Sequence, residues 1–365
     1  MSAHLFSPVT LGPNTFSNRV VIAPMAQYSA VNGNANDWHL MHWGSLVTGG
    51  AGLVMIEATG VEEFGRPTPG DIGLYDDESE AALRRVVSAL RSFGSAKLGI
   101  QLFHGGRKGS TDVHWNGGGE LLIRQGGWET IAPSPIPYRN GWQVPREMTE
   151  PDFIRVKNAF VDATIRAARI GFDVIEVHAA HGYLLHQFLS PITNLRSDRY
   201  GGPIENRMRF PLEVFEAISL AVPNWITLGA RITGSDWIEG GIDEDEAVIF
   251  ASALKDLGCH YVDVSSGAID PHLQKIVIGP NYQVGFADTV RQRTGIAVRA
   301  VGLIVTPTQA EDIIASGKAD QVAIARAALV NPRWVWKAAR ELGVSIDYPK
   351  QYDRAAPDAW PGWTY

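Results

Sequence analysis

The stretch Val174-Ile-Glu-Val-His-Ala-Ala-His-Gly-Tyr183 joins a short apolar run to two imidazoles and a phenol. The apolar run is typical of a β-strand, and Gly182 indicates a turn at its end. His178, His181 and Tyr183 follow within six residues, close enough to donate two hydrogen bonds and a proton to one bound molecule. A pair of structural histidines is the alternative interpretation, but three clustered polar groups after a strand favour a chemical site.

Similar apolar runs occur along the whole chain, each separated from the next by enough residues for a helix. They predict eight parallel strands near residues 20–25, 53–58, 97–103, 174–179, 227–232, 261–265, 297–301 and 321–325. Helical patterns fall between most of them, at 76–93, 150–170, 206–221, 243–257, 306–316 and 331–342. This alternation predicts an α/β fold, a (β/α)8 TIM barrel. A doubly wound sheet is the competitor, but no glycine-rich fingerprint follows the first strand.

Length and composition limit the class of protein. The 365 residues, 45% of them hydrophobic, are enough for one elaborated barrel domain over residues 1–365. A formal charge of -7 argues against a nucleic-acid or anionic-membrane partner. The single cysteine, Cys259, excludes an intramolecular disulfide and is expected to be buried. Without a hydrophobic leader or a long apolar run, the sequence predicts a soluble, cytoplasmic protein.

Two segments depart from a minimal barrel. Residues 104–149, after the third strand, are rich in Gly, Trp and Pro and are too long for an ordinary connection, so we expect an inserted lid, ordered and containing a small hairpin. Residues 347–365 form an aromatic C-terminal tail. Such a tail is expected to pack either on its own barrel or on a neighbouring subunit, and the sequence favours neither.

The carboxyl ends of the strands share one face of a barrel, where active sites lie. Phosphate groups often bind after the seventh and eighth strands, where Gly302 offers an amide and Arg326 a cation. Gln101 can donate and accept at a pyrimidine edge, and Arg231 can stabilise negative charge. Flavin mononucleotide (FMN) fits this combination.

Longer motifs carry a resemblance to a known family. They are Asn18-Arg-Val-Val-Ile-Ala-Pro-Met25, Gln27-Tyr28, His104-Gly-Gly-Arg-Lys108, His178-Ala-Ala-His-Gly-Tyr183 and Phe188-Leu-Ser-Pro-Ile-Thr-Asn-Leu-Arg-Ser-Asp-Arg-Tyr-Gly-Gly-Pro-Ile-Glu-Asn-Arg207. With them the chain resembles the Old Yellow Enzyme family of NADH:flavin oxidoreductases, in its thermophilic-like, xenobiotic reductase A-like branch. The resemblance covers essentially the whole chain, from Phe6 to Arg354 or beyond.

The resemblance implies two sets of site residues. Non-covalent FMN would be held by Pro24, Met25, Ala26, Ala58, Gln101, His178, Arg231, Ala300, Gly302, Ala325 and Arg326. The substrate would be bound by Tyr28, Lys108, His178, His181 and Tyr183, and no metal site is expected. The resemblance also implies a homodimer or a dimer of dimers, in which Arg354 or Trp360 of the tail enters the neighbouring site.

The activity implied by the resemblance is that of an ene-reductase working in two steps. NADPH or NADH delivers a hydride to flavin N5, and an activated alkene, such as an enone or maleimide, or a nitro compound or nitrate ester, then occupies the same place. His178 and His181 would polarise the substrate while Tyr183 protonates the α carbon. Ala26 stands where the branch commonly has a cysteine, so the resemblance does not determine the redox potential of the flavin. It does not determine the physiological substrate or the preferred nicotinamide either.

Two other enzyme classes use similar residues. A metal-dependent hydrolase would need Glu176 beside His178 and His181 as zinc ligands, but no carboxylate at the end of the eighth strand completes such a site. A Schiff-base aldolase would need a lysine at the ends of the fourth to eighth strands, where the sequence has none. Metal content and a yellow colour of the purified protein distinguish these classes from a flavoenzyme.

Overall fold

The computed structural model describes residues 3–360 and 362, and a closed barrel of eight parallel strands forms its centre. Around the barrel the strands follow their order in the chain, and β12 pairs with β3 to close it. Their bounds are β3 Val20–Ile22, β4 Leu53–Gly60, β5 Lys97–Phe103, β8 Val174–Ala179, β9 Thr227–Thr233, β10 Tyr261–Ser265, β11 Ala297–Ala300 and β12 Gln321–Ile324. Each overlaps a predicted strand, so the predicted TIM barrel is confirmed.

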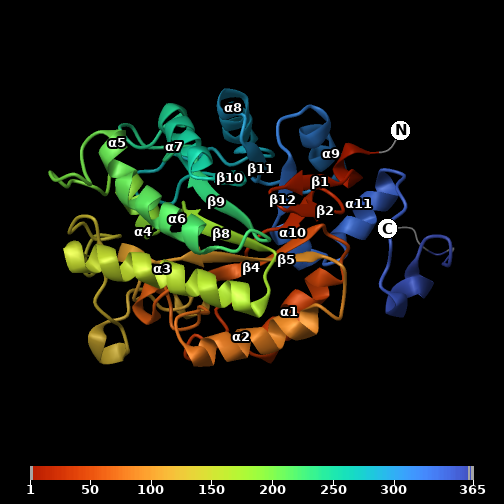
Figure 1. The fold of residues 1–365 in the computed structure, drawn as a ribbon, viewed down its shortest axis with the longest axis horizontal. Coiled ribbons are helices and arrows are strands. Elements are labelled where there is room, and N and C mark those ends of the chain that lie inside the picture. The colour runs from red at the N-terminus through yellow and green to blue at the C-terminus, as the bar shows by residue number, and fades with distance from the viewer. Residues whose placement is uncertain (1–2, 361, 363–365) are drawn as a thin grey trace.

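Helices cover the outside of the barrel (Figure 1). They are α1 Asp37–Val47, α2 Asp77–Leu90, α3 Glu150–Ile170, α4 Leu184–Leu189, α5 Ile204–Arg207, α6 Arg209–Ala221, α7 Glu244–Asp256, α8 Val284–Thr294, α9 Pro307–Ala315, α10 Arg326–Val330 and α11 Trp334–Glu341. The six predicted helices correspond to α2, α3, α6, α7, α9 and α11. Sequence analysis missed α1 and α8, and the short α4 and α10, because their apolar residues do not form a clear stripe.

Capping residues fix where several helices begin and end. The Asp76 carboxylate accepts a hydrogen bond from the Ser79 amide at 2.7 Å, which starts α2. Thr306 caps α9 in the same way, through the amide of Gln309 at 3.2 Å. At the other end of α3, Gly171 adopts a φ of 97°, a left-handed conformation that glycine adopts without strain. Local chemistry therefore sets the length of the connections between strands and helices.

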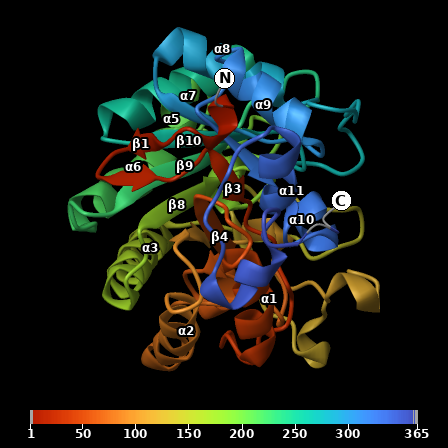
Figure 2. The same cartoon turned by 90° about the vertical axis from the view of Figure 1, so that its right-hand side faces the viewer.

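A hairpin of β1 (Val9–Leu11) and β2 (Asn14–Phe16) closes the amino-terminal end of the barrel. Figure 2 shows it lying across β9 and β10. Phe16 is fully buried among the inward-facing residues of the strands. The Asn14 amide donates to the carbonyl oxygens of Asp173, at 3.1 Å, and Trp225, at 3.0 Å. This hairpin was not predicted, because Thr10 and Thr15 interrupt its two short strands and leave no apolar run.

The insertion at residues 104–149 is ordered and contains short elements. These are three 3-10 helices, Gly106–Lys108, His114–Asn116 and Ile123–Gln125, and the strands β6 (Ile131–Ala132) and β7 (Arg146–Glu147). The two strands pair in parallel and so do not form a hairpin. The loop 133–145 between them is long enough to return the chain to its starting side, which a tight hairpin turn does not do. The small hairpin expected in this segment lies at the antiparallel bridge between Thr111 and Glu120, where the Leu121 amide donates to the Ser110 carbonyl oxygen at 2.7 Å.

The first half of the tail packs on the barrel of its own chain. The rings of Tyr348 and Tyr352 lie 4.6 and 5.7 Å from that of Trp336 on α11. The Arg333 guanidinium lies over both Trp336, at 4.7 Å, and Tyr352, at 4.8 Å. Trp363 and Tyr365 lie outside the described residues.

No helix in residues 3–360 and 362 is long and apolar enough to cross a membrane. Cys259 is buried, as predicted, and its thiol lies 3.1 Å from the Tyr261 carbonyl oxygen.

Candidate active site

A cavity of about 200 Å³ lies at the carboxyl ends of the strands. Residues from four predicted positions line it: Arg231 at the end of β9, Gly302 after β11, and Ala325 and Arg326 after β12. His181 lines it as well, so Gly302 and Arg326, where we predicted a phosphate site, share one cavity with the histidine cluster. Two larger surface grooves lie beside the tail and contain none of these residues.

His178 and His181 form a directed chain of hydrogen bonds. The Ala180 amide donates to Nδ1 of His178 at 3.1 Å, which places the proton of a neutral His178 on Nε2. That nitrogen lies 3.2 Å from Nδ1 of His181, whose Nε2 lies 2.6 Å from Ser265 Oγ. Burial, with the nearby Arg231 guanidinium, lowers the pKa of both rings well below the ordinary value. Each ring is therefore neutral and has one N–H to donate.

Tyr183 lies at the start of α4, beside the histidines. The centroid of its ring lies 5.0 Å from that of His178 and 4.9 Å from that of Phe103. Burial and the neighbouring Asp71 carboxylate raise its pKa above the usual value near 10. The phenol therefore keeps its proton at neutral pH, as a general acid requires.

Lys108 joins this cluster from the insertion. Its ammonium donates to the His181 carbonyl oxygen at 2.7 Å and lies 4.8 Å from the Tyr183 ring. On its other side, at 5.0 Å, lies the ring of Tyr138. Burial, followed by repulsion from Arg107 and Arg139, lowers the pKa of Lys108 to about 7. Sequence analysis missed Tyr138, because no periodic pattern marks the segment that carries it.

Polar side chains fill the barrel below the cavity. Gln101 donates its amide to Glu176 at 2.7 Å, and its own carbonyl oxygen remains an acceptor. The second Glu176 oxygen accepts from Tyr261 and Arg299, both at 2.8 Å. Because these bonds satisfy the Glu176 carboxylate inside the barrel, it does not join His178 and His181 as the zinc-hydrolase alternative requires.

Arg231 stands at the top of this polar layer. Its Nε lies 3.3 Å from the carboxylate of Asp263, which is fully buried. Burial raises the pKa of Asp263 to about 6, against the attraction of Arg231. Arg231 Nε has no aligned hydrogen-bond acceptor within the described part of the chain.

The remaining predicted residues differ in position. Pro24, Met25 and Ala26 follow β3 and are half-buried, and Ala58 lies at a β-bulge of β4 opposite Gln101. Tyr28 has a left-handed φ of 51°, and the centroid of its ring lies 5.3 Å from that of His114 and 5.9 Å from that of Trp115, both in the insertion.

Three other predicted residues, all in the C-terminal part, do not line the cavity. Ala300 is fully buried in the outer core, and the next residue, Val301, lines the cavity. Arg354 and Trp360 are exposed on the tail, and neither lines the cavity of its own chain.

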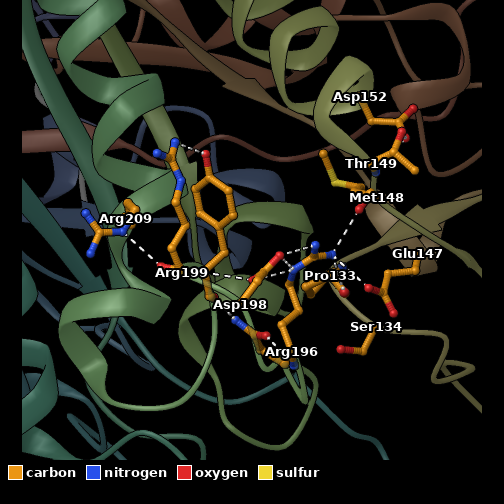
Figure 3. Close-up of polar contacts among 12 residues, drawn as sticks. Pro133, Ser134, Glu147, Met148, Thr149, Asp152, Arg196, Asp198, Arg199 and Arg209 are labelled. Carbon is orange, nitrogen blue, oxygen red and sulfur yellow. Dashed lines mark hydrogen bonds and ion pairs between the residues drawn. The ribbon is translucent and has the colours of Figure 1, made fainter.

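Two arginines hold the insertion in place. Arg196, after α4, donates to the carbonyl oxygens of Pro133, at 3.0 Å, and Met148, at 2.9 Å, which directly follow β6 and β7 (Figure 3). Arg107 donates to the carbonyl oxygens of Pro137, at 3.1 Å, and Ile269, at 2.6 Å. Both arginines belong to the long motifs of the resemblance, which was the available signal for them.

The residues around the cavity fit FMN. Gly302 has a φ of +116°, and a Cβ there would lie 3.0 Å from the Gln283 side chain, so the backbone reaches the cavity only with glycine. Arg231 supplies a buried cation, and Arg326 lines the same cavity with a second cation. This set suits a ligand with a planar polar ring system and a phosphate group.

A parallel barrel with polar residues gathered at its carboxyl face is the architecture of an α/β-barrel enzyme. Residues 4–344 match the NADH:flavin oxidoreductase / NADH oxidase family, and the chain belongs to this family of oxidoreductases. The family-level resemblance to the Old Yellow Enzymes is thereby confirmed.

Several known proteins are similar over most of this chain. An NADPH dehydrogenase of Geobacillus sp. is 41% identical, with both chains covered fully. An NADH:flavin oxidoreductase of Gibberella zeae is 42% identical, over 96% of this chain and 89% of its own. Among solved structures, morphinone reductase superposes with a TM-score of 0.78 at 28% identity, covering 96% of this chain and 92% of its own. The barrel therefore agrees with that of a solved relative.

Proposed function

We propose that this protein is an FMN-dependent ene-reductase, which reduces alkenes conjugated to an electron-withdrawing group at the expense of NADPH or NADH. The observation that carries the proposal is the convergence of His178, His181 and Tyr183 beside a cavity lined by Arg231 and Arg326. Membership of the family and the 41% identity to an NADPH dehydrogenase support it. A relative, morphinone reductase, has been solved in complex with tetrahydroNAD.

FMN would be bound without a covalent link. Gly302, Ala325 and Arg326 would contact its phosphate, and Gln101 and Arg231 the pyrimidine part of the ring, with Pro24, Met25, Ala26, Ala58, His178 and backbone near Ala300 completing the contacts. When bound, FMN supplies the site that accepts a hydride from the nicotinamide and gives it to the alkene. The Arg231 guanidinium provides fixed positive charge beside that site.

The side chains of this chain would activate the alkene and supply its proton. His178 has its proton on Nε2, where a carbonyl or nitro oxygen could replace His181 as the acceptor. His181 would rotate its N–H from Ser265 to the same oxygen, so that two neutral donors polarise it. Tyr183, with its raised pKa, would hold the proton for the α carbon.

Further details of the proposal concern the surroundings of the site. Tyr28 and Lys108 would contact the substrate, and the 104–149 insertion would form a lid that selects it by shape. We place the chain in the thermophilic-like branch, in the cytoplasm, as a homodimer or dimer of dimers. The exposed position of Arg354 and Trp360 is compatible with contacts to a neighbouring subunit.

Anaerobic stopped-flow absorbance spectroscopy tests the proposal. Purified protein should be yellow, lose its flavin absorbance on mixing with NADPH or NADH, and regain it on mixing with an activated alkene such as 2-cyclohexen-1-one. A panel of maleimides, nitroalkenes and nitrate esters would then define the substrate class. Protein that binds no FMN, or reduced protein that none of these compounds reoxidises, would contradict the assignment.

A further inference from the structure

The loop that follows β8 has an uncommon backbone conformation. His181 has a φ of 55° and Gly182 a φ of 71°, so two consecutive residues are left-handed. For a histidine this conformation is uncommon, and it persists only where surrounding contacts enforce it. A Cβ at Gly182 would lie 2.2 Å from the Ala268 carbonyl oxygen, so the loop also packs closely against its neighbour. Because His181 and Tyr183 flank Gly182, this backbone sets the direction of both side chains.

Buried side chains hold the two peptide groups of this loop. The Gly182 amide donates to Nδ1 of His186 at 2.8 Å, and its carbonyl oxygen accepts from Gln187 at 2.7 Å. Lys108 binds the preceding carbonyl oxygen, that of His181. His186 lies on α4, is fully buried, and does not line the cavity.

A carboxylate fixes the His186 ring. Nε2 of His186 lies 2.8 Å from an oxygen of Asp236, which is also fully buried. Since Nδ1 accepts the Gly182 amide, the ring proton resides on Nε2 and is donated to Asp236. The other Asp236 oxygen accepts from Ser190 Oγ at 2.7 Å and the Ile242 amide at 2.9 Å. Burial acts to raise the pKa of Asp236, but His186 and the other donors hold it below its ordinary value.

We infer that His186 and Asp236 are positioning residues for the reaction. Asp236 belongs to the loop after β9, the strand that carries Arg231, so the pair ties the β9 loop to the loop that holds His181 and Tyr183. The inference rests on the proposed function, because it assigns the pair to the placement of the proposed proton donor. Neither residue touches the cavity, and both act through the Gly182 amide.

The rates of the two half-reactions distinguish a role in placing Tyr183 from a general structural role. Reduction by NADPH uses no proton from Tyr183, whereas reoxidation by an alkene does. A displacement of about 1 Å in a reacting group can lower a rate on the order of 100-fold. Loss of the His186 acceptor should therefore slow reoxidation and leave reduction nearly unchanged.

Three substitutions remove different contacts of the His186–Asp236 pair. His186→Asn offers an oxygen near the position of Nδ1 and keeps an acceptor for the Gly182 amide, whereas His186→Leu removes both contacts. Asp236→Asn leaves the ring in place and weakens its orientation. His260→Leu is the matched control, because Nδ1 of His260 accepts the Leu228 amide at 3.0 Å at the opposite end of the barrel. Thermal unfolding and FMN content establish that each variant is folded and loaded.

We expect His186→Leu to slow reoxidation by 2-cyclohexen-1-one about tenfold or more, with reduction by NADPH changed less than about twofold. His186→Asn should recover most of the loss, and Asp236→Asn should fall between them. Should His186→Leu not fold, Asp236→Asn carries the same comparison. In a Tyr183→Phe background the His186 substitution should add little, since a residue acting through another is not additive with it.

Three results would overturn the inference: equal slowing of both half-reactions, a His186→Leu effect no larger than that of His260→Leu, or full additivity with Tyr183→Phe. Any of these would leave the proposed function standing if the wild-type protein completes both half-reactions. Wild-type protein that is reduced by NADPH but not reoxidised by any activated alkene would instead remove the proposed function, and the inference with it.

Discussion

The two ends of the barrel are built from the same strands but differ in chemistry. At the amino-terminal end, the β1–β2 hairpin buries Phe16 and uses Asn14 to satisfy carbonyl oxygens. At the carboxyl end, the buried Arg231, Arg326 and the neutral His181 line a cavity, and the protonated phenol of Tyr183 lies beside the histidine cluster. Left-handed residues other than glycine occur there at Tyr28 and His181.

The difference teaches how a barrel separates stability from function. Apolar burial and satisfied backbone groups at one end supply folding free energy. At the carboxyl end, strained backbone and polar side chains with perturbed pKa values reduce the folding free energy. Such features are typical of binding and catalytic sites. Substitutions at the carboxyl end should therefore change reaction rates, and substitutions at the amino-terminal end should change the free energy of unfolding.

The largest expected effect is on the rate, at the carboxyl end. Tyr183→Phe removes the proposed proton donor and should slow alkene-driven reoxidation by about 10²–10⁴-fold, the usual contribution of a general acid. Stopped-flow absorbance with 2-cyclohexen-1-one measures this, and unfolding by urea should show stability close to wild type. Tyr348→Phe on the tail, whose ring packs on Trp336, is the control. Reoxidation at the wild-type rate would remove Tyr183 from the mechanism.

The largest expected effect on stability lies at the opposite end. Phe16→Ala empties a fully buried site and should lower the free energy of unfolding by about 3–5 kcal/mol. Urea unfolding measures the loss, with Leu220→Ala as the control because Leu220 is 84% exposed. Both half-reactions should keep their rates in folded protein. A selective loss of activity without a loss of stability would contradict the division between the two ends.

Asn14→Ala should have a smaller effect of the same kind. The Trp225 carbonyl oxygen would lose the donor that Asn14 supplies, whereas that of Asp173 keeps the Thr227 amide at 2.9 Å; one buried group left unsatisfied costs about 1–3 kcal/mol. Thr10→Ala, in the same hairpin, removes only an exposed hydroxyl contact with Thr15 and should cost less than about 0.5 kcal/mol. Equal losses in the two variants would show that the hairpin is not held by Asn14.

The smallest expected effect is a pH dependence at the carboxyl end. Because the pKa of Lys108 is about 7, its ammonium is lost as the pH rises through that value. In the proposed reaction the ammonium, 4.8 Å from the Tyr183 ring, would stabilise the negative charge that develops as the phenol gives up its proton. Reoxidation should therefore slow by about tenfold between pH 6 and pH 8, the effect of one pKa unit on Tyr183.

Lys108→Met should flatten this profile at the level that the wild-type protein reaches at high pH. Lys318→Met, at an exposed position, should keep the wild-type profile. A profile that is unchanged in Lys108→Met would assign the pH dependence to another group.

The sequence predicted those parts of the molecule that depend on local patterns. The barrel strands lie within mostly apolar runs, and His178, His181, Tyr183 and Lys108 belong to compact motifs, so both could be recognised. In the β1–β2 hairpin each three-residue strand contains a threonine, so neither strand forms an apolar run. The parallel pairing of β6 with β7 depends on the path of the intervening loop, which local propensity does not determine.

Contacts between distant segments were not predictable. His186 meets Asp236 across 50 residues, and Arg196 meets Pro133 across 63. No spacing rule links such pairs, because the barrel topology brings them together. The tail was left between two interpretations for a similar reason: packing of Tyr348 and Tyr352 on Trp336 depends on where α11 lies.

A crystal structure of the yellow, FMN-loaded protein tests the central claim most directly, because the claim concerns what the carboxyl-end cavity binds. The account predicts density for the phosphate at Gly302 and Arg326 and for the flavin ring beside His178, His181 and Arg231. Flavin bound elsewhere, or a ring out of reach of both histidines, would contradict it.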